Sequence, residues 1–238
     1  MVSAVALRQD HAVTSRAAAS IRHDVLDRYR HLREIGKQHH TDVLPFVSRD
    51  AILHNARRIG LGDGKTLVLD SMDDLTLAFD LAIYTAPTGR SRAIDRYAGL
   101  TPCAPGSDEA LVLEAMRHAR FAIVCVERRH DAAGLIVSDL FRGIELWLLD
   151  EGLEISLPDG SLLATRLFTP DSFAMTAGVL VPFEIEMLED VLCEAPQLGR
   201  KTPAALVDDR RFAEAIYRIA LADGIMEQVT YLDPSSDG

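Results

Sequence analysis

Residues 121–181 read FAIVCVERRHDAAGLIVSDLFRGIELWLLDEGLEISLPDGSLLATRLFTPDSFAMTAGVLV, a pattern in which apolar runs alternate with turn residues. Six runs are rich in the aliphatic and aromatic residues that favour strands: FAIVCVE, LIVSDL, IELWLL, LEISL, SLLATRLF and SFAMTAGVLV. Between them HDAAG, FRG, DEG and PDG supply the Gly and Asp typical of hairpin turns. Such runs, spaced by roughly 8–12 residues, predict a small antiparallel β barrel or sandwich over about residues 121–181.

The sequence before this unit has a helical period. Apolar residues recur at three- and four-residue steps between about Ser15 and Gln38, which predicts an amphipathic helix. Ser48 and Ser107 stand where N-caps are expected, each ahead of a further helix. A short strand is expected at Thr66–Leu69, after a turn.

The sequence after the β unit predicts two C-terminal helices, over Phe183–Cys193 and residues 204–222. The fold class is therefore α+β. Residues 1–105 form a mainly helical region with one short strand. Residues 106–238 hold a helix, the β unit and the C-terminal helices, and the two regions can combine into one integrated domain.

The composition is that of an ordinary globular protein, with 48% apolar and 26% charged residues. No apolar run is long enough to cross a bilayer, and the leading residues MVSAVALRQDH lack the basic start of a signal peptide. We therefore expect a cytoplasmic protein without membrane contact. Its three cysteines are widely spaced, and Cys125 and Cys193 are expected to be buried.

Charge is divided unevenly along the chain. Residues 1–60 hold ten basic and six acidic residues, whereas the remainder holds fifteen and thirty, which gives the net charge of −11. A basic front on an acidic body predicts self-association or a protein partner, and the front can also dock on the body of its own chain. Nucleic acid is a less favoured partner of the Arg-rich N-terminal helices, because an acidic protein repels phosphates.

The segment GLGDGKT, residues 60–66, resembles the end of a phosphate-binding loop. The motif needs a glycine separated by four residues from the Gly-Lys pair, and that position is Ile59. The expected order is also reversed, since a helix precedes the segment and a strand follows it. The segment predicts a helix end and a turn, and no cofactor is predicted.

His39, His40 and Asp42 are the candidate metal ligands of the sequence. Adjacent histidines point in different directions on a helix, and no HExxH, HxH or cysteine pair accompanies them. A solvated histidine pair at a helix end is the plainer interpretation, and a metal site is the alternative.

Three segments carry a family resemblance: DLAIYTAPTGRSRAIDRYAGL (residues 80–100), GSDEALVLEAMRHARFAIVCVE (106–127) and DGSLLATRLF (159–168). They resemble uncharacterised bacterial proteins with a helical front and a closing β unit, over roughly residues 20–185. The resemblance implies the same fold and assigns no catalytic residue.

These observations favour a non-catalytic interaction or regulatory protein. Two alternatives from other classes stay open. One is a metal-dependent hydrolase that uses the His39/His40 region, and the other is a nucleic-acid binder that uses the N-terminal helices.

Overall fold

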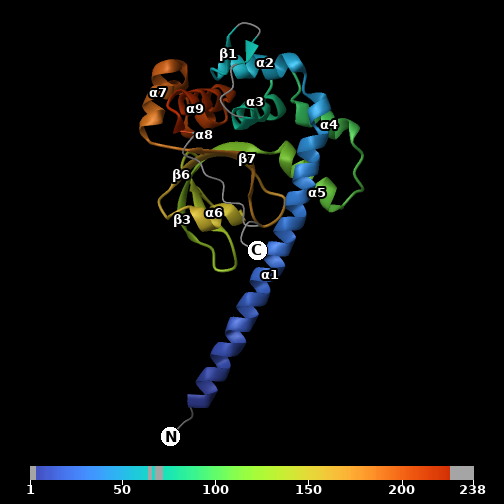
Figure 1. Cartoon of the computed structure of the whole chain (residues 1–238), viewed down its shortest axis with the longest axis vertical. Helices are drawn as coiled ribbons and strands as arrows, with labels where there is room; N and C mark the ends of the chain where they lie inside the picture. Colours follow the sequence, from blue (N-terminus) through green and yellow to red (C-terminus); the bar gives the residue numbers. More distant parts are fainter. Residues whose placement is uncertain (1–3, 64–65, 68–71, 226–238) are drawn as a thin grey trace.

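The computed structural model describes residues 4–63, 66–67 and 72–225 of the chain. The part before the large sheet is mainly helical (Figure 1). Its elements are α1 (Ala4–Asp42), the 3-10 helix η1 (Leu44–Phe46), α2 (Arg49–Arg58), the two-residue strands β1 (Gly62–Asp63) and β2 (Thr66–Leu67), α3 (Met72–Tyr84), α4 (Ala93–Leu100) and α5 (Asp108–Arg117).

The large sheet has five strands in the order β5-β4-β3-β6-β7, and every neighbouring pair is antiparallel. The longest strand, β3, lies at its centre. The elements from here to the end of the described chain are β3 (Arg120–Arg129), β4 (Leu135–Asp139), β5 (Ile144–Leu148), α6 (Glu151–Ser156), β6 (Leu162–Phe168), β7 (Met175–Pro182), α7 (Glu186–Glu194), the 3-10 helix η2 (Pro196–Arg200), α8 (Pro203–Val207) and α9 (Arg210–Ala222).

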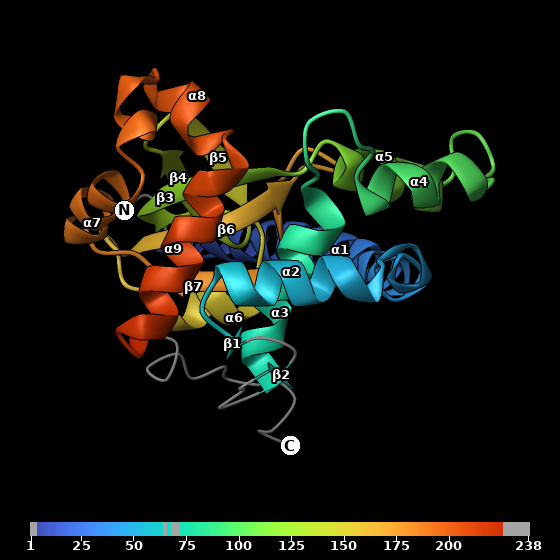
Figure 2. The same ribbon diagram turned by 90° about the horizontal axis from the view of Figure 1, so that it is seen from above.

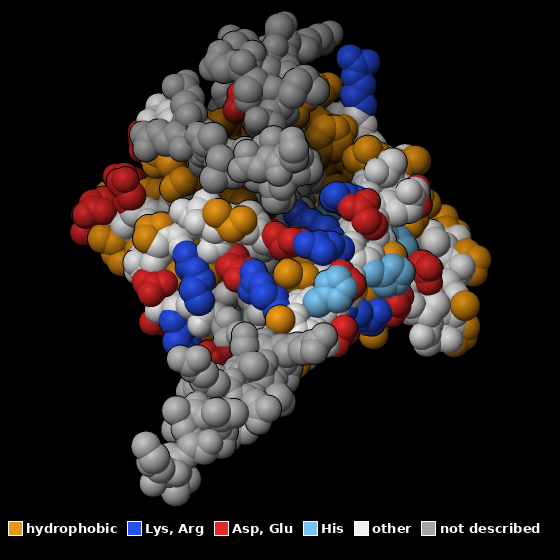
Figure 3. Space-filling model, turned by 60° about the horizontal axis from the view of Figure 1, so that its bottom comes forward, with side chains coloured by type: hydrophobic (Ala, Val, Ile, Leu, Met, Phe, Trp, Pro, Cys, Tyr) orange, Lys and Arg blue, Asp and Glu red, His pale blue; other side chains and the backbone are white. Residues whose placement is uncertain are grey.

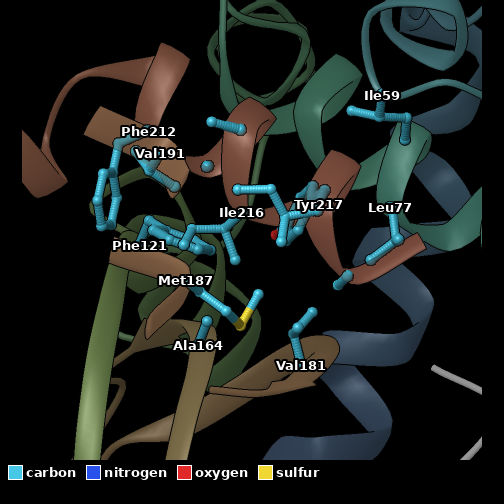
Figure 4. Close-up of a cluster of buried hydrophobic side chains, with 14 of the residues drawn as sticks. Ile59, Leu77, Phe121, Ala164, Val181, Met187, Val191, Phe212, Ile216 and Tyr217 are labelled. Atoms are coloured by element: carbon cyan, nitrogen blue, oxygen red, sulfur yellow. The ribbon is translucent and has the colours of Figure 1, made fainter. Parts of the chain in front are cut away.

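The helices α2, α3, α7 and α9 lie over one face of the sheet (Figures 1 and 2). Alternate residues of the strands point to opposite faces, so Phe121 and Ala164 join the helix-covered core while Ala122 and Leu163 join a core on the other face. In Figure 4, side chains of α7 and α9 such as Met187 face the strands. The burial of apolar surface between helices and sheet therefore supplies the main stabilisation.

Three sequence predictions about the sheet are confirmed or corrected by the strand pairing. The antiparallel β unit within residues 121–181 is confirmed, but a closed barrel or a sandwich is wrong, because β5 and β7 are the edges of one open sheet. An isolated bridge joins Leu148 of β5 to Ala174, the residue before β7. The run LEISL is not a strand: the Asp150 side chain accepts a hydrogen bond from the Leu153 backbone N–H and so caps α6.

The predicted N-caps are confirmed, since Ser48 and Ser107 accept hydrogen bonds from the backbone N–H groups three residues on. The helix predicted over 204–222 is instead two helices, because Asp209 caps a new helix, α9. Cys193 is exposed and Cys125 is half-buried, so the prediction that both are buried was wrong. Residues 64–65 of the GLGDGKT segment and 68–69 of the expected strand lie outside the described residues.

The basic helix α1 docks on acidic residues of its own chain. Arg28 binds Asp108 with two hydrogen bonds of 2.6 and 2.8 Å and also contacts Asp171, while Arg30 binds Glu151. Basic and acidic side chains accordingly lie intermixed on the face from which the N-terminal half of α1 projects (Figure 3). No helix in the described ranges has both the length and the apolar character needed to span a membrane.

Candidate functional site

Arg166 is a charged residue at a core position of the sheet. It lies on β6 directly opposite Phe121 of β3, and therefore on the helix-covered face. Only 4% of its surface is exposed. Its Nε and Nη2 atoms donate to the two carboxylate oxygens of Asp80 on α3, at 2.7 and 2.8 Å. Such a bidentate pair is the strongest geometry available to a buried arginine.

Aromatic side chains surround this ion pair. The hydroxyl of Tyr217 on α9 donates to Asp80 Oδ2 at 2.8 Å. The Arg166 guanidinium lies 5.0 Å from the ring centroid of Tyr84, within cation–π range. Burial opposes the charge on Arg166, but Asp80 outweighs it and raises the pKa of the guanidinium. Burial, with a smaller effect of Asp80, also raises the pKa of Tyr217, which keeps its hydroxyl protonated as a donor.

The network continues from Tyr84 into α1. The hydroxyl of Tyr84 lies 2.7 Å from Nε2 of His40, whose Nδ1 lies 3.0 Å from the carbonyl oxygen of Gly36. Because a carbonyl only accepts, Nδ1 carries the hydrogen and Nε2 accepts from Tyr84. Burial, with a smaller effect of Arg33, lowers the pKa of His40 to about 4. His40 is therefore a neutral acceptor at pH 7.

The strand next to Arg166 is irregular. Thr165 pairs with Leu180 and Leu167 pairs with Thr176, so β7 has an extra pair of residues opposite Arg166. Gly178 lies in this bulge with φ of 101°, a conformation that side chains disfavour. The bulge interrupts the sheet at the buried ion pair.

A cavity of about 470 Å³ lies beside the network, and Arg166, Tyr84 and Phe121 contribute to its wall. We call it the arginine cavity. Its charged lining residues are Arg90, Arg92, Arg120, Arg166, Arg210, Asp95, Asp208 and Asp209. They come from the turn before α4, from α4, β3 and β6, and from the junction of α8 and α9.

Each aspartate of the arginine cavity is in an ion pair. The pairs are Asp95 with Arg92, Asp208 with Arg142, and Asp209 with Arg211. Hydrogen bonds from these arginines lower the pKa of Asp95 and that of Asp209. These two carboxylates therefore stay ionised and are weak bases.

Two arginines of the cavity have no counterion among the residues that the structure describes. The side chains of Arg90 and Arg120 are exposed and make no hydrogen bond or ion pair with the part of the chain that the structure describes. Arg210 is only loosely paired, 3.9 Å from a Glu214 carboxylate that Arg58 also binds. The cavity can therefore offer free guanidinium donors to an anion.

His39, His40 and Asp42 do not converge. His39 is buried, with Nε2 on the carbonyl of Glu109 at 3.0 Å and Nδ1 on the hydroxyl of Tyr97 at 2.8 Å. Asp42 accepts from Gln38. The interpretation of a solvated histidine pair was wrong, because each imidazole packs against a tyrosine at the end of a long helix.

Both ring nitrogens of both histidines already have partners. Within the described ranges, no group of three or more His, Cys, Asp or Glu side chains is placed to hold a metal ion. The metal site at His39, His40 and Asp42 stays a prediction, to which this hydrogen bonding gives no support. Metal analysis of the protein and of a His39→Ala/His40→Ala variant tests it.

Comparison with family models gives a match, over residues 23–230, to a family described as a family of unknown function, DUF7986. The chain belongs to the DUF7986 family. The match spans α1 from His23 to beyond α9, so it includes every residue of the buried network and of the arginine cavity. Neither the curated proteins nor the solved structures contain a match to this DUF7986 chain.

Sequence reasoning missed Arg166 and Asp80, although a signal was present. The alternation in LLATRLF places Arg166 on the same side of the strand as Ala164 and Phe168. The helical period of α3 places Asp80 on one stripe with Leu77. A basic and an acidic residue on two otherwise apolar faces predict each other as partners.

Proposed function

We propose that this protein is a non-catalytic binding protein that takes a small anionic molecule in the arginine cavity. The observation that supports the proposal is the pair Arg90 and Arg120, two guanidinium groups at one cavity that have no partner in the described part of the chain. Guanidinium groups bind carboxylates and phosphates through paired N–H donors. A volume of about 470 Å³ also lies within the range of about 300–1,000 Å³ typical of small-molecule sites.

The state of the lining acids favours binding over proton transfer. A general base works best when its pKa lies near the working pH. Asp95 and Asp209 are instead ion-paired with lowered pKa values. The Tyr84 hydroxyl is engaged with His40, and burial raises its pKa. These groups therefore fix the shape and charge of the cavity.

The proposal is tested by thermal denaturation of the full chain with citrate, inorganic phosphate or pyrophosphate at low salt. A ligand that binds only the folded state stabilises it by RT ln(1 + [L]/Kd), or about 2.7 kcal/mol at a hundredfold excess over Kd. We expect a saturable rise in melting temperature with at least one of these anions. The rise should disappear in Arg90→Gln/Arg120→Gln.

A matched control removes the same charge elsewhere. Arg49 and Arg57 of α2 lie outside the arginine cavity, and their side chains have no ion pair among the described residues. Arg49→Gln/Arg57→Gln should keep the full rise in melting temperature. An equal response of both double variants, or no response of the wild type to any of the anions, would contradict the proposal.

A further inference from the structure

We infer that the ligand of the arginine cavity carries two negative charges, as a phosphate monoester or a dicarboxylate does. This inference rests on the proposed function and adds the charge class of the ligand. It follows from the charge of the lining and from the elements that supply it.

The lining has a formal charge of +2, because five arginines face three aspartates. The ion pairs show which of these arginines lack a counterion. Arg166 is neutralised by Asp80 and Arg92 by Asp95, while Asp208 and Asp209 are held by arginines outside the lining. Arg210 shares the carboxylate of Glu214 with Arg58, so Arg90 and Arg120 are the lining arginines left without a counterion among the described residues. A dianion matches the two guanidinium groups of Arg90 and Arg120, whereas a monoanion leaves one of them without a partner.

The two free arginines belong to different elements. Arg90 closes the turn before α4, with its backbone N–H bound to the carbonyl of Pro87, whereas Arg120 is the first residue of β3. The ligand therefore meets two separate donor groups, and Arg166, which is paired with Asp80, adds no net charge to the cavity wall. This arrangement suits a group whose charge is spread over several oxygens, or two carboxylates at a distance.

The positive cavity is a local feature of an acidic protein. The whole chain carries a net charge of −11, which repels anions in general. A site that must bind a dianion on such a surface needs its own concentrated positive charge.

Isothermal titration of the full chain with two matched ligand pairs tests the inference at pH 7.5 and low salt. The first pair is glycerol 3-phosphate against dimethyl phosphate, and the second is succinate against acetate. We expect at least one dianion to bind about tenfold or more tightly than its monoanionic partner, the usual effect of one charge-assisted contact. The ligand pair with the larger ratio of affinities shows whether the cavity prefers a phosphate monoester or a dicarboxylate.

Changing pH separates the two sources. The second ionisation of a phosphate monoester has a pKa near 6, so binding of glycerol 3-phosphate should weaken between about pH 7.5 and pH 5.5. Binding of succinate should change less over the same range, because its two carboxylates have lower pKa values.

The variants Arg90→Gln and Arg120→Gln each remove one charge. Each should therefore reduce the ratio of dianion affinity to monoanion affinity about tenfold. Arg57→Gln should leave the ratio unchanged. If mono- and dianions bind equally well to the arginine cavity, the dianion inference is wrong and anion binding stands. If no anion binds, both the dianion inference and the proposed function are wrong.

Discussion

At the scale of single residues, the pair of Arg166 and Asp80 has the largest energetic consequences. Removing a charge from water costs several kcal/mol even after relaxation, so each partner depends on the other. The two hydrogen bonds between them, the Tyr217 hydroxyl and the Tyr84 ring offset that cost. Loss of one member should therefore be worse than loss of both.

The variant Asp80→Asn should lower the free energy of unfolding by about 3–5 kcal/mol, because it leaves the Arg166 charge buried without a counterion. The double variant Asp80→Leu/Arg166→Met replaces the pair by apolar side chains, and it should recover most of that loss. Urea denaturation of the wild type and both variants measures the difference. A double variant no more stable than Asp80→Asn would contradict this account.

His40 should make stability depend on pH. Burial lowers its folded pKa from 6.5 to about 4, so the unfolded chain takes up a proton first as the pH falls. The stability that neutral His40 contributes is present above about pH 6.5 and is lost on the way to pH 4, by up to about 3 kcal/mol.

Urea titrations at pH 7, 5.5 and 4.5 check this expectation. The variant His40→Gln should lose the component that falls between pH 6.5 and 4, whereas His118→Gln, at an exposed histidine, should follow the wild type. Parallel pH profiles for the wild type and His40→Gln would show that His40 is not the titrating group.

At the scale of elements, the bulge in β7 and a tight turn beside β4 depend on glycine. A Cβ at Gly178 would meet open space, so Gly178→Ala costs only backbone strain, about 1–2 kcal/mol. At Gly134 a Cβ would also lie 2.4 Å from the carbonyl oxygen of Leu148, so Gly134→Ala should cost more.

Gly99 in α4 has an ordinary backbone conformation and free space around it. Gly99→Ala should therefore stabilise the protein by about 0.5–1 kcal/mol, as alanine does in a helix. Thermal denaturation of the three variants should rank them Gly99→Ala, Gly178→Ala, Gly134→Ala in order of decreasing stability. A stabilising Gly178→Ala would refute the strained geometry of the bulge.

The attachment of α1 combines ion pairs with an apolar face. Arg28 is about one-third exposed, so Arg28→Ala should cost no more than about 1 kcal/mol, and less at high salt. Leu32 is fully buried, so Leu32→Ala should cost about 2–5 kcal/mol at any salt concentration. Urea denaturation in 0.05 and about 1 M NaCl distinguishes the two contributions. A larger effect of Arg28→Ala would show that charge holds the helix.

At the scale of the whole molecule, basic residues of the N-terminal front form ion pairs with acidic residues of the body of the same chain. The predicted self-association and a protein partner stay predictions, and the ion pairs of α1 do not require a second copy. Size-exclusion chromatography with light scattering at low and high salt tests the dimer. A monomer under both conditions would exclude association through the basic front.

Features that depend on nearby residues could be predicted from the sequence. The caps Ser48 and Ser107 each act within three residues, and most strands lie between recognisable turns. The run LEISL was wrongly predicted as a strand because its apolar and polar residues alternate. The nearby Asp150 instead caps a helix, α6. Whether the sheet closes into a barrel could not be predicted from the sequence. Closure depends on hydrogen bonding between the edge strands β5 and β7, which are far apart in the chain.

The candidate site depends on contacts across long sequence separations. Asp80 and Arg166 are 86 residues apart, and His40 and Tyr84 are 44 residues apart. A buried charge on one face signals that a partner exists, but the sequence does not say which one. The histidines were likewise expected in solvent because their tyrosine partners come from other helices.

The isolated bridge between Leu148 and Ala174 has a consequence for amide hydrogen exchange. Leu149 N–H donates to Ala174 O, and Ala174 N–H donates to Trp147 O, at the corner where the two edges of the sheet meet. Edge strands ordinarily fray first, and their amide hydrogens exchange early. Here these two hydrogen bonds join the edges. The amide hydrogens of Leu149 and Ala174 should therefore exchange as slowly as those of the central strand, β3. Local opening of the sheet should then begin at the ends of β5 and β7 that lie away from this bridge.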